Sequence, residues 1–271
     1  TLAEGHRGAV CLLLLGYDRE LMSKWGFDRQ LATDDIVYLA GGHDEHGNEI
    51  EPLDEEAVRS ALLARRETVE AFAVSGYFGV RNPSHELRVR SLVEELTGLP
   101  VTCGHELTSK LNAVRRATTV ALNAHLILPL RELIASVQRT LDAWGIAAPL
   151  MVVKGDGSLV RAEWAMQRPI ETILSGPAAS AVGAWHLAGR RDVWAVDIGG
   201  TTTDIARLHN GAPILNPAGA YVGGWQTMVE AVDVHTTGLG GDSYVRLDEE
   251  RRLQIGPRRV VPLSLLAREG P

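Results

Sequence analysis

The period of the hydrophobic pattern changes several times along the chain. Residues 9–15 form an unbroken apolar run, which predicts a buried strand. The segment "EPLDEEAVRSALLARRETVEAFAVSGYF" predicts a helix followed by a strand, with Asp54 as the N-cap and glutamates in the first helical turn. Ala57, Leu62 and Val69 are expected to contribute to the inner face of this unit.

The middle of the chain is dominated by helical spacing. "PSHELRVRSLVEELTGLP" predicts a helix that is capped by Ser84 and ends at Gly98, and "PVTCG" predicts a short strand after it. From about Leu107 the pattern is helical again, and one apolar stripe predicts core packing. The stripe consists of Leu126, Leu130, Leu133, Ile134, Val137, Leu141 and Trp144.

The last part of the chain alternates turns with strands. "APLMVVKGDGSLV" predicts two strands around a Gly-Asp-Gly turn, and "LDEERRLQIG" predicts a hairpin. "SGPAASAVGAWHLAG" predicts a turn that enters a helix, with Pro177 in its first turn. Strands alternating with helices predict an α/β architecture, and 271 residues suggest two domains, the second beginning between Leu107 and Asn123.

The stretch "VWAVDIGGTTTDIARLHNG" at 193–211 carries the most specific chemistry. An apolar run ends at Asp197, turns at Gly199 and Gly200, and resumes as a strand from Asp204. The glycine turn is therefore expected to join two adjacent antiparallel strands. Dinucleotide-binding and Walker A loops join a strand to a helix, and the GK[ST] of Walker A is absent from this chain, so neither motif fits.

This turn has the residues of an anion site. The two glycines permit a tight turn and leave backbone N–H groups open to an approaching phosphate, while Thr201 and Thr202 add hydroxyl donors. Asp197 and Asp204 would repel that phosphate unless a cation such as Mg²⁺ lay between them, usually through retained waters. The alternative is a hairpin whose aspartates only cap turns; the complete D-x-G-G-T-x-x-D pattern favours phosphate binding.

Composition narrows the class of protein. Hydrophobic residues make up 45% and charged residues 23%, as in ordinary globular proteins, and the net charge of −7 argues against a nucleic-acid binder. Cys11 and Cys103 lack metal-ligand spacing and are expected to be buried thiols in a reducing compartment. The first apolar run is too short for a membrane span, so a cytoplasmic protein without a membrane partner is expected.

Other polar groups have simpler interpretations. Helix capping is favoured over a substrate-side role for His85 and Glu86, and a solvated strand end is favoured over a phosphate contact for Lys154. The segment "GGHDEHGNE" at 41–49 is expected to be a solvated acidic loop rather than a metal site. Residues 175–177 could direct helix N–H groups toward an anion or form only a tight turn, and both alternatives stay open.

Two segments resemble a known ATPase superfamily. "DIGGTTTD" resembles the phosphate motif of the actin, sugar-kinase and Hsp70-like ATPases, and "TTGLGGDS" at 236–243 resembles their glycine-rich segment beside the nucleotide. The superfamily places the nucleotide between two ribonuclease-H-like domains that contribute one phosphate hairpin each. The resemblance implies a nucleotide site here, composed of Gly199, Gly200, Thr201, Thr202, Gly238, Gly240 and Gly241.

Further segments resemble the hydantoinase A/oxoprolinase family, in the order expected for it. They are "GNEIEPLDEEAVR", "RNPSHELRV", "RRATTVALNAHLILP" and "RPIETILSGPAASAVGA". The resemblance implies ribonuclease-H-like (actin-like ATPase) domains with mixed sheets, the first incomplete. Residues 1–110 would be the remainder of the N-terminal domain, and 111–271 the first part of the hydantoinase A domain with the second phosphate hairpin.

The resemblance also implies a function. It suggests an ATP- and magnesium-dependent hydrolase of a small cyclic amide of the hydantoin or 5-oxoproline type. Asp197 and Asp204 would be catalytic, and Asp197 would orient the metal. A B-type hydantoinase subunit and a homo- or hetero-oligomer are implied partners. The ATP-using subunit of a ketone carboxylase and a non-catalytic ATP-binding module are the alternatives.

The chain departs from the family pattern at three places. No D-x-G-G-T-x-T-D hairpin precedes the region that matches the family, so we expect a fragment with little activity by itself. "KGDGS" at 154–158 and "IGPRRVVPLSLL" near the end also differ from the usual family segments. These differences indicate a divergent branch and leave the substrate, and the choice between hydrolase and carboxylase, open.

Overall fold

The structure is a computed structural model that describes residues 9–262 and 265. The chain forms two compact units, each of which is described by itself. Unit 1 contains the described residues up to Lys154, together with Ser158–Ile173 and Pro217–Glu230; unit 2 contains Gly155–Gly157, Leu174–Asn216 and the described residues from Ala231 onward. These units are defined by the contacts between residues. The expected domain boundary after residue 110 is based on the resemblance to the family and stays a prediction.

Unit 1 is built on a parallel sheet with the strand order β2-β1-β5-β6. Its strands are β1 (Val10–Leu15), β2 (Asp35–Leu39), β5 (Ala71–Gly76) and β6 (Val101–Cys103). All residues of β1 and β5 are buried, which confirms the strand predicted from the apolar run. The helices of this unit are α1 (Arg19–Lys24), α2 (Glu55–Arg65), α3 (Ser84–Thr97), α4 (Gly104–Leu107), α5 (Ala113–Ala143) and α6 (Ala162–Ala165).

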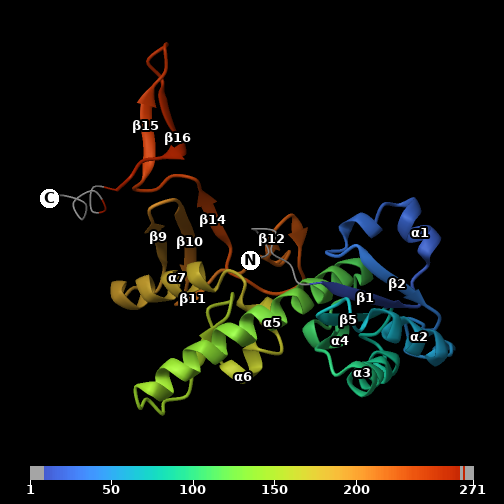
Figure 1. Cartoon of the computed structure of the whole chain (residues 1–271). Coiled ribbons are helices and arrows are strands. Elements are labelled where there is room, and N and C mark those ends of the chain that lie inside the picture. Colours follow the sequence, from blue (N-terminus) through green and yellow to red (C-terminus); the bar gives the residue numbers. More distant parts are fainter. Residues whose placement is uncertain (1–8, 263–264, 266–271) are drawn as a thin grey trace. The chain divides into compact units, whose positions relative to one another are not determined.

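The side chains of β1 alternate between the two faces of the sheet. Cys11, Leu13 and Leu15 belong to one buried cluster with residues of α2 and α3, including Leu62 and Leu92. Helix α5 contacts β5 and β1, and Figure 1 shows it along the side of the sheet opposite α2 and α3. The sheet is therefore covered on both faces, as an all-parallel sheet requires.

Short paired elements complete unit 1. They are the hairpins β3 (Gly42–His43) with β4 (Glu49–Glu51), β7 (Met151–Val153) with β8 (Leu159–Arg161) and β12 (Tyr221–Val222) with β13 (Trp225–Gln226), and the 3-10 turns η2 (Asp28–Gln30) and η3 (Pro169–Thr172). The strand-turn-strand prediction around Gly-Asp-Gly is thus confirmed.

Two helix predictions need correction. Helix α3 ends at the left-handed Gly98 as expected, but its N-cap is Pro83; the backbone N–H of Ser84 donates to Asn82 Oδ1 instead. The predicted core stripe of α5 is buried only in part, since Leu133 is 59% exposed and Trp144 is 75% exposed. Helical spacing identifies an apolar face, but the neighbouring elements decide how far along the helix that face is covered.

Helix α5 is also the one helix among the described residues that is long and apolar enough to cross a membrane. By length and composition alone, the core helix of a soluble protein passes the same test. The residues Arg116–His125 of α5 are all buried inside unit 1, and Asn123 there donates to Thr102 Oγ1 and to the Gln167 carbonyl. The burial of these residues accounts for the apolar character of this part of α5 as core packing.

Unit 2 is antiparallel. Helix α7 (Ser175–Ala188) packs on β9 (Val193–Ile198) and β10 (Thr203–His209), and β10 also pairs with β11 (Ala212–Pro213) and β14 (Val234–Thr237). The core between them consists mainly of small side chains, Ala178, Ala181, Ala195 and Ala206, so the helix can lie close to the sheet. The predicted C-terminal hairpin is confirmed as β15 (Ser243–Leu247) and β16 (Leu253–Arg259). A parallel and an antiparallel sheet with helices confirm the α/β class.

Candidate functional site

The glycine-threonine turn joins two antiparallel strands, as predicted. Strands β9 and β10 pair from Val193↔Leu208 to Ile198↔Thr203, and the turn between them closes with a 2.9 Å hydrogen bond from the Gly199 N–H to the Thr202 carbonyl. No helix begins after the glycines, so this turn is distinct from a dinucleotide-binding or Walker A loop.

The turn leaves a run of backbone donors open. Among the described residues, no protein acceptor receives a hydrogen bond from the backbone N–H groups of Gly200, Thr201 or Thr202. Gly200 and Thr201 are exposed, so these groups meet solvent. Successive unpaired N–H groups in a turn form an anion-binding concavity, which is the geometry that phosphate recognition needs.

Asp197 and Asp204 lie directly opposite each other on β9 and β10. Side chains of such a pair have Cβ atoms about 4.5–5.5 Å apart on the same face of the sheet, and two like charges there destabilise it. Asp197 Oδ2 accepts a 2.7 Å hydrogen bond from Ser180 Oγ on α7, and Asp204 Oδ1 accepts a 2.5 Å bond from Thr236 Oγ1 on β14. The two hydroxyls orient the carboxylates, but neither neutralises them.

Both carboxylates line one groove on unit 2. The groove has a volume of about 400 Å³ and is bounded by α7, β9, β10 and Val234. Its helical wall includes Pro177, Ser180 and Ala184, and its lining contains no lysine or arginine. A groove with two facing carboxylates and no cationic side chain suits a cation, because oxygen ligands are those that Mg²⁺ prefers.

A hydrated magnesium ion is compatible with this donor set. Within the described part of the chain, Asp197 and Asp204 do not belong to a compact group of three or more metal-ligating side chains. Magnesium usually keeps several waters and is held by one or two carboxylates together with substrate phosphates. The pair of aspartates and the open N–H groups of Gly200, Thr201 and Thr202 therefore match a magnesium-phosphate ligand better than a cage made only of protein.

The segment Gly238–Gly241 packs against the turn. The N–H groups of Gly241 and Asp242 donate to the carbonyls of Gly199 and Gly200, and Thr203 Oγ1 donates to the Leu239 carbonyl. A Cβ at Gly240 would lie 2.5 Å from the carbonyl carbon of Gly200, so only glycine fits. This predicted nucleotide segment thus supports the hairpin directly; its approach to a nucleotide stays a prediction.

The reason for the hairpin glycines differs from the expected one. Neither Gly199 nor Gly200 has a left-handed backbone, so the tight turn does not itself demand glycine. A Cβ at Gly200 would instead lie 2.8 Å from Asp242 Oδ2, which is paired with Arg259 Nη2 at 2.5 Å. Close approach of the Asp242 side chain therefore limits the space for a side chain at this position.

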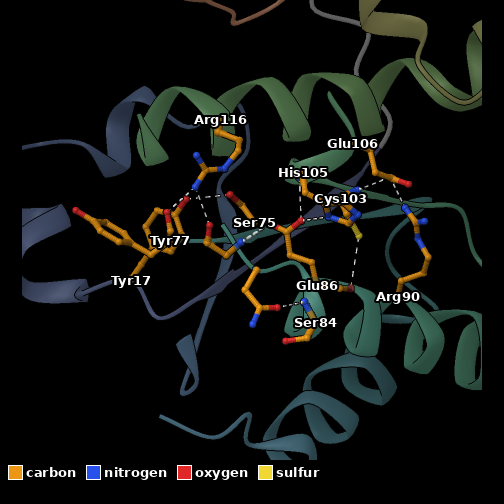
Figure 2. A network of polar contacts seen from close by, with 12 residues as sticks. Tyr17, Ser75, Tyr77, Ser84, Glu86, Arg90, Cys103, His105, Glu106 and Arg116 are labelled. Carbon is orange, nitrogen blue, oxygen red and sulfur yellow. Dashed lines mark hydrogen bonds and ion pairs between the residues drawn. The ribbon is translucent and has the colours of Figure 1, made fainter. Parts of the chain in front are cut away.

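The interpretation of His85 and Glu86 as capping residues is wrong. Glu86 is 1% exposed; its Oε1 accepts the Gly76 N–H at 2.7 Å, and its Oε2 accepts the His105 N–H at 3.0 Å and contacts His105 Nδ1 at 2.5 Å. Figure 2 shows this network and, beside it, Arg116, whose Nη2 donates to the carbonyls of Gly76 and Tyr77.

Glu86, Cys103 and His105 place ligand atoms within 4.8 Å of one another, but they do not suit a metal. Both carboxylate oxygens of Glu86 already accept backbone N–H groups. Burial, and then the nearby Glu86 carboxyl, raise the pKa of the Cys103 thiol well above its ordinary range, so the thiolate that binds metals is disfavoured. The cluster is a structural network that fixes the end of β5.

Four other predictions have outcomes in the structure. His43 is 5% exposed and its ring lies tilted against that of His85 with ring centroids 4.4 Å apart, so segment 41–49 is not simply a solvated loop. Lys154 pairs with Glu171 at 3.3 Å and is not a free strand end. Residues 175–177 begin α7, and Pro177 lines the groove. Cys11 and Cys103 are buried and free, as expected.

Sequence reasoning missed Ser180 and Thr236, the hydroxyls that hold the two aspartates. Ser180 lies within a segment noted only for its glycine and proline, and Thr236 lies within one noted for its glycines. An amphipathic projection of α7 could have suggested that Ser180 faces the strand, since it shares the helix face of Pro177, Ala181 and Ala184. No local signal identifies Thr236, because its partner is 32 residues away.

Two of the similar proteins have enzyme names that refer to an amide or a ketone. The chain is 31% identical to the caprolactamase subunit alpha of Pseudomonas jessenii over 78% of its length, and 28% identical to the acetophenone carboxylase gamma subunit of Aromatoleum aromaticum over 79%. It covers 31% of each of these relatives, about a third of their length. The crystal structure of the ATP-dependent caprolactamase from P. jessenii matches 95% of this chain and 40% of that chain, with a TM-score of 0.78 and 28% identity.

Family models match two parts of the chain. The hydantoinase/oxoprolinase N-terminal region matches residues 15–97, and the hydantoinase/oxoprolinase model matches residues 116–265, which include the hairpin and the glycine segment. The chain therefore belongs to the hydantoinase/oxoprolinase family.

Proposed function

We propose that the protein carrying this chain is an ATP-dependent hydrolase of a cyclic amide, and that the β9–β10 hairpin binds phosphate and magnesium. The observation that carries the proposal is the juxtaposition of three open backbone N–H groups with a facing pair of aspartates. Family membership and the similarity to a caprolactamase subunit support the substrate class.

Each residue of the site has a definable role. The N–H groups of Gly200, Thr201 and Thr202 bind phosphate oxygens, while Asp197 and Asp204 orient a hydrated magnesium ion. Ser180 and Thr236 hold the carboxylates in place, and Gly240 lets the second segment brace the turn. When bound, magnesium and ATP would supply a transferable phosphoryl group, which turns an unreactive amide oxygen into a better leaving group. Catalysis of phosphoryl transfer depends mainly on such positioning and charge stabilisation.

A ketone-carboxylase function is the second candidate, favoured by the similarity to the acetophenone carboxylase gamma subunit. The activation of a carbonyl oxygen would be the same. In the carboxylase, the α-carbon of the activated ketone would bond to carbon dioxide with loss of phosphate, whereas in the hydrolase the carbon of the activated amide would bond to water. ATP turnover that requires both bicarbonate and a ketone would select the carboxylase. Turnover that requires only a cyclic amide would select the hydrolase.

The test is Asp197→Asn in the full-length protein, assayed for substrate-dependent ATP hydrolysis. Asparagine keeps the size and a hydrogen-bond acceptor for Ser180, so we expect normal folding. We expect turnover to fall by roughly 10²-fold or more, about 3 kcal/mol of transition-state stabilisation. Asp233→Asn is the matched control, because Asp233 is an exposed aspartate of the same unit outside the groove.

Thr202→Val refines this test. It removes one hydroxyl but keeps the backbone donor, so its loss of turnover should be smaller than that of Asp197→Asn. Unchanged turnover in well-folded Asp197→Asn protein would remove this aspartate from the catalytic site. Binding of ATP without any turnover in the wild type would favour the non-catalytic module.

A further inference from the structure

A second concave site lies in unit 1, at the carboxyl ends of the central strands. Strand β2, which follows β1 in the chain, pairs with one edge of β1, and β5 pairs with its other edge, so the order of the strands reverses at β1. In open parallel sheets, the crevice beyond the strand ends at such a reversal is where ligands bind. Gly16 and Tyr17 follow β1 there, and Tyr77 and Phe78 follow β5.

These four residues line a crevice of about 500 Å³, together with residues of α1, β3 and the first turn of α5. This volume lies within the range typical of small-molecule sites, roughly 300–1,000 Å³. The lining is mainly apolar and aromatic, and it includes Met22, Trp25 and Phe27. Tyr17, Met22 and His43 are almost fully buried, whereas Trp25 is 65% exposed, so the crevice has a closed floor and an open rim.

The aromatic floor is held in a fixed arrangement. The Tyr17 and Tyr77 rings meet edge to face with centroids 5.2 Å apart, and Tyr77 meets Phe78 in the same way at 5.1 Å. Tyr17 Oη bonds Ser75 Oγ and the Ala113 carbonyl, both at 2.9 Å. In Figure 2, Tyr17 and Tyr77 lie beside Arg116. Arg116 donates hydrogen bonds to the Gly76 and Tyr77 carbonyls and so restrains the backbone at this strand end.

The buried network of Glu86 and Arg116 therefore has a consequence at the crevice. Glu86 fixes the N–H of Gly76, and Arg116 fixes the two carbonyls that follow. These bonds set the backbone that carries the Tyr77 ring. A network of this kind preorganises an aromatic binding site from behind, and preorganisation reduces the ordering cost of binding.

The charges around the crevice select the ligand. Asp18, Asp44 and Glu45 contribute to the lining, which contains no lysine or arginine. Burial, and then the neighbouring His85, lower the pKa of His43, so this imidazole is neutral at pH 7. Three carboxylates without a lysine or arginine in the lining disfavour an anionic ligand that brings no metal ion with it.

We propose that this crevice binds a small organic molecule that has a flat ring body and carries no negative charge. The ring would pack on Tyr77 and Trp25, and a polar substituent would face the rim of carboxylates. The proposal goes beyond the proposed ATP chemistry and does not depend on it, because every lining residue belongs to unit 1. Binding is therefore expected without nucleotide.

The experiment compares three probes of one shape and different charge: benzamide, benzamidine and benzoate. Affinities are measured by ligand-observed NMR on the full-length protein without nucleotide. A ligand of this size reaches a Kd on the order of 1 mM, about −4 kcal/mol. We expect benzamide and benzamidine to bind in this range and benzoate to bind at least tenfold more weakly.

Two variants locate the binding. Tyr77→Ala should weaken benzamide binding at least tenfold, since Tyr77 is 43% exposed and its removal opens the floor. Tyr221→Ala is the matched control; it removes a tyrosine of the same unit that is 64% exposed and lies outside the crevice, and it should change the Kd less than twofold. If Tyr77→Ala does not fold, Trp25→Ala takes its place.

The outcomes separate this proposal from the ATP site. Equal binding of benzoate and benzamide, unchanged binding in folded Tyr77→Ala protein, or no binding of benzamide and benzamidine at tenfold the expected Kd would each overturn it. None of these results would affect the turnover test with Asp197→Asn. Conversely, an inactive hairpin would leave probe binding in unit 1 intact.

Discussion

Unit 1 and unit 2 both bring carboxyl groups together with hydroxyl or N–H donors, but under opposite conditions. In unit 1, Glu86 is 1% exposed and both of its oxygens accept hydrogen bonds, so its polar group is fully matched by the protein. In unit 2, Asp197 and Asp204 face each other across two strands, line an open groove and receive one hydroxyl each.

This difference separates structural from functional polar groups. A buried polar group is stable in a fold only when its hydrogen bonds are complete, and Glu86 meets that condition. Two facing carboxylates in a groove destabilise the empty protein and gain most from a ligand that brings positive charge. A carboxyl group whose charge is not balanced beside solvent therefore indicates a binding site. A buried carboxyl group whose hydrogen bonds are complete indicates a structural role.

The largest expected effect tests the structural side of this comparison. Glu86→Ala would leave the Gly76 and His105 donors without their acceptor in or near the core, and each such loss costs about 1–3 kcal/mol. We expect the free energy of unfolding to fall by about 3–5 kcal/mol, measured by urea denaturation. Glu95→Ala on the same helix is the control, because its ion pair with Arg59 is at the surface and 3.7 Å long. A loss below 1 kcal/mol for Glu86→Ala would contradict the structural role.

A second prediction concerns the support of the hairpin. In Gly240→Ala, the new Cβ would lie 2.5 Å from the Gly200 carbonyl carbon and 2.6 Å from the Thr201 nitrogen, so backbone must move. We expect a loss of about 1–3 kcal/mol in thermal unfolding, together with weaker binding of magnesium-ATP. Gly238→Ala is the matched control for the stability measurement, since a Cβ there meets nothing within 4 Å. Equal losses of stability in the two variants would argue against close packing of this segment on the turn.

A third prediction sharpens the comparison through pH. Burial acts to raise the pKa of Glu106, but the hydrogen bond and charge of Arg90 outweigh it and hold this pKa below its ordinary value of 4.5. The folded state therefore favours the carboxylate, and the resulting stability is present above pH 4.5 and lost as pH falls through the lower, folded pKa. In Glu106→Gln, the free energy of unfolding should be lower at pH 7 by about 1 kcal/mol or less, with a shallower fall between pH 5 and pH 3.

The control for this pH effect is Glu67→Gln, since Glu67 is 82% exposed and pairs only with the adjacent Arg66 among the described residues. Its pH profile should follow that of the wild type. If the free energy of unfolding falls equally steeply between pH 5 and pH 3 in wild type and Glu106→Gln, the ion pair of Glu106 with Arg90 does not contribute to the pH dependence of folding.

The smallest expected effect is a gain in stability, whereas the three effects above are losses. Asp197→Asn removes one of two facing charges, so the protein without magnesium or nucleotide should gain roughly 0.2–1 kcal/mol in thermal unfolding. Asp233→Asn should leave the unfolding temperature unchanged. A clear loss of stability in Asp197→Asn would mean that this carboxylate supports the turn and would break the contrast with Glu86.

The sequence by itself determined the local structure of the site. The apolar flanks, the two glycines and the spacing of the aspartates predict a strand-turn-strand unit, and pairing across that short turn brings Asp197 opposite Asp204. Alternation in the strand then places both carboxylates on one face. These properties depend on neighbours within a few residues, so periodicity and turn chemistry are sufficient to predict them.

Only the tertiary structure decided which distant groups complete the site. Ser180 reaches Asp197 because α7 packs on β9 through small alanines, and Gly240 is required because its segment returns to within contact of Gly200. Glu86 has the sequence signature of a helix start, yet its carboxyl group serves the end of β5. The free energy of such contacts arises from the packing of elements far apart in sequence, so no local spacing encodes them.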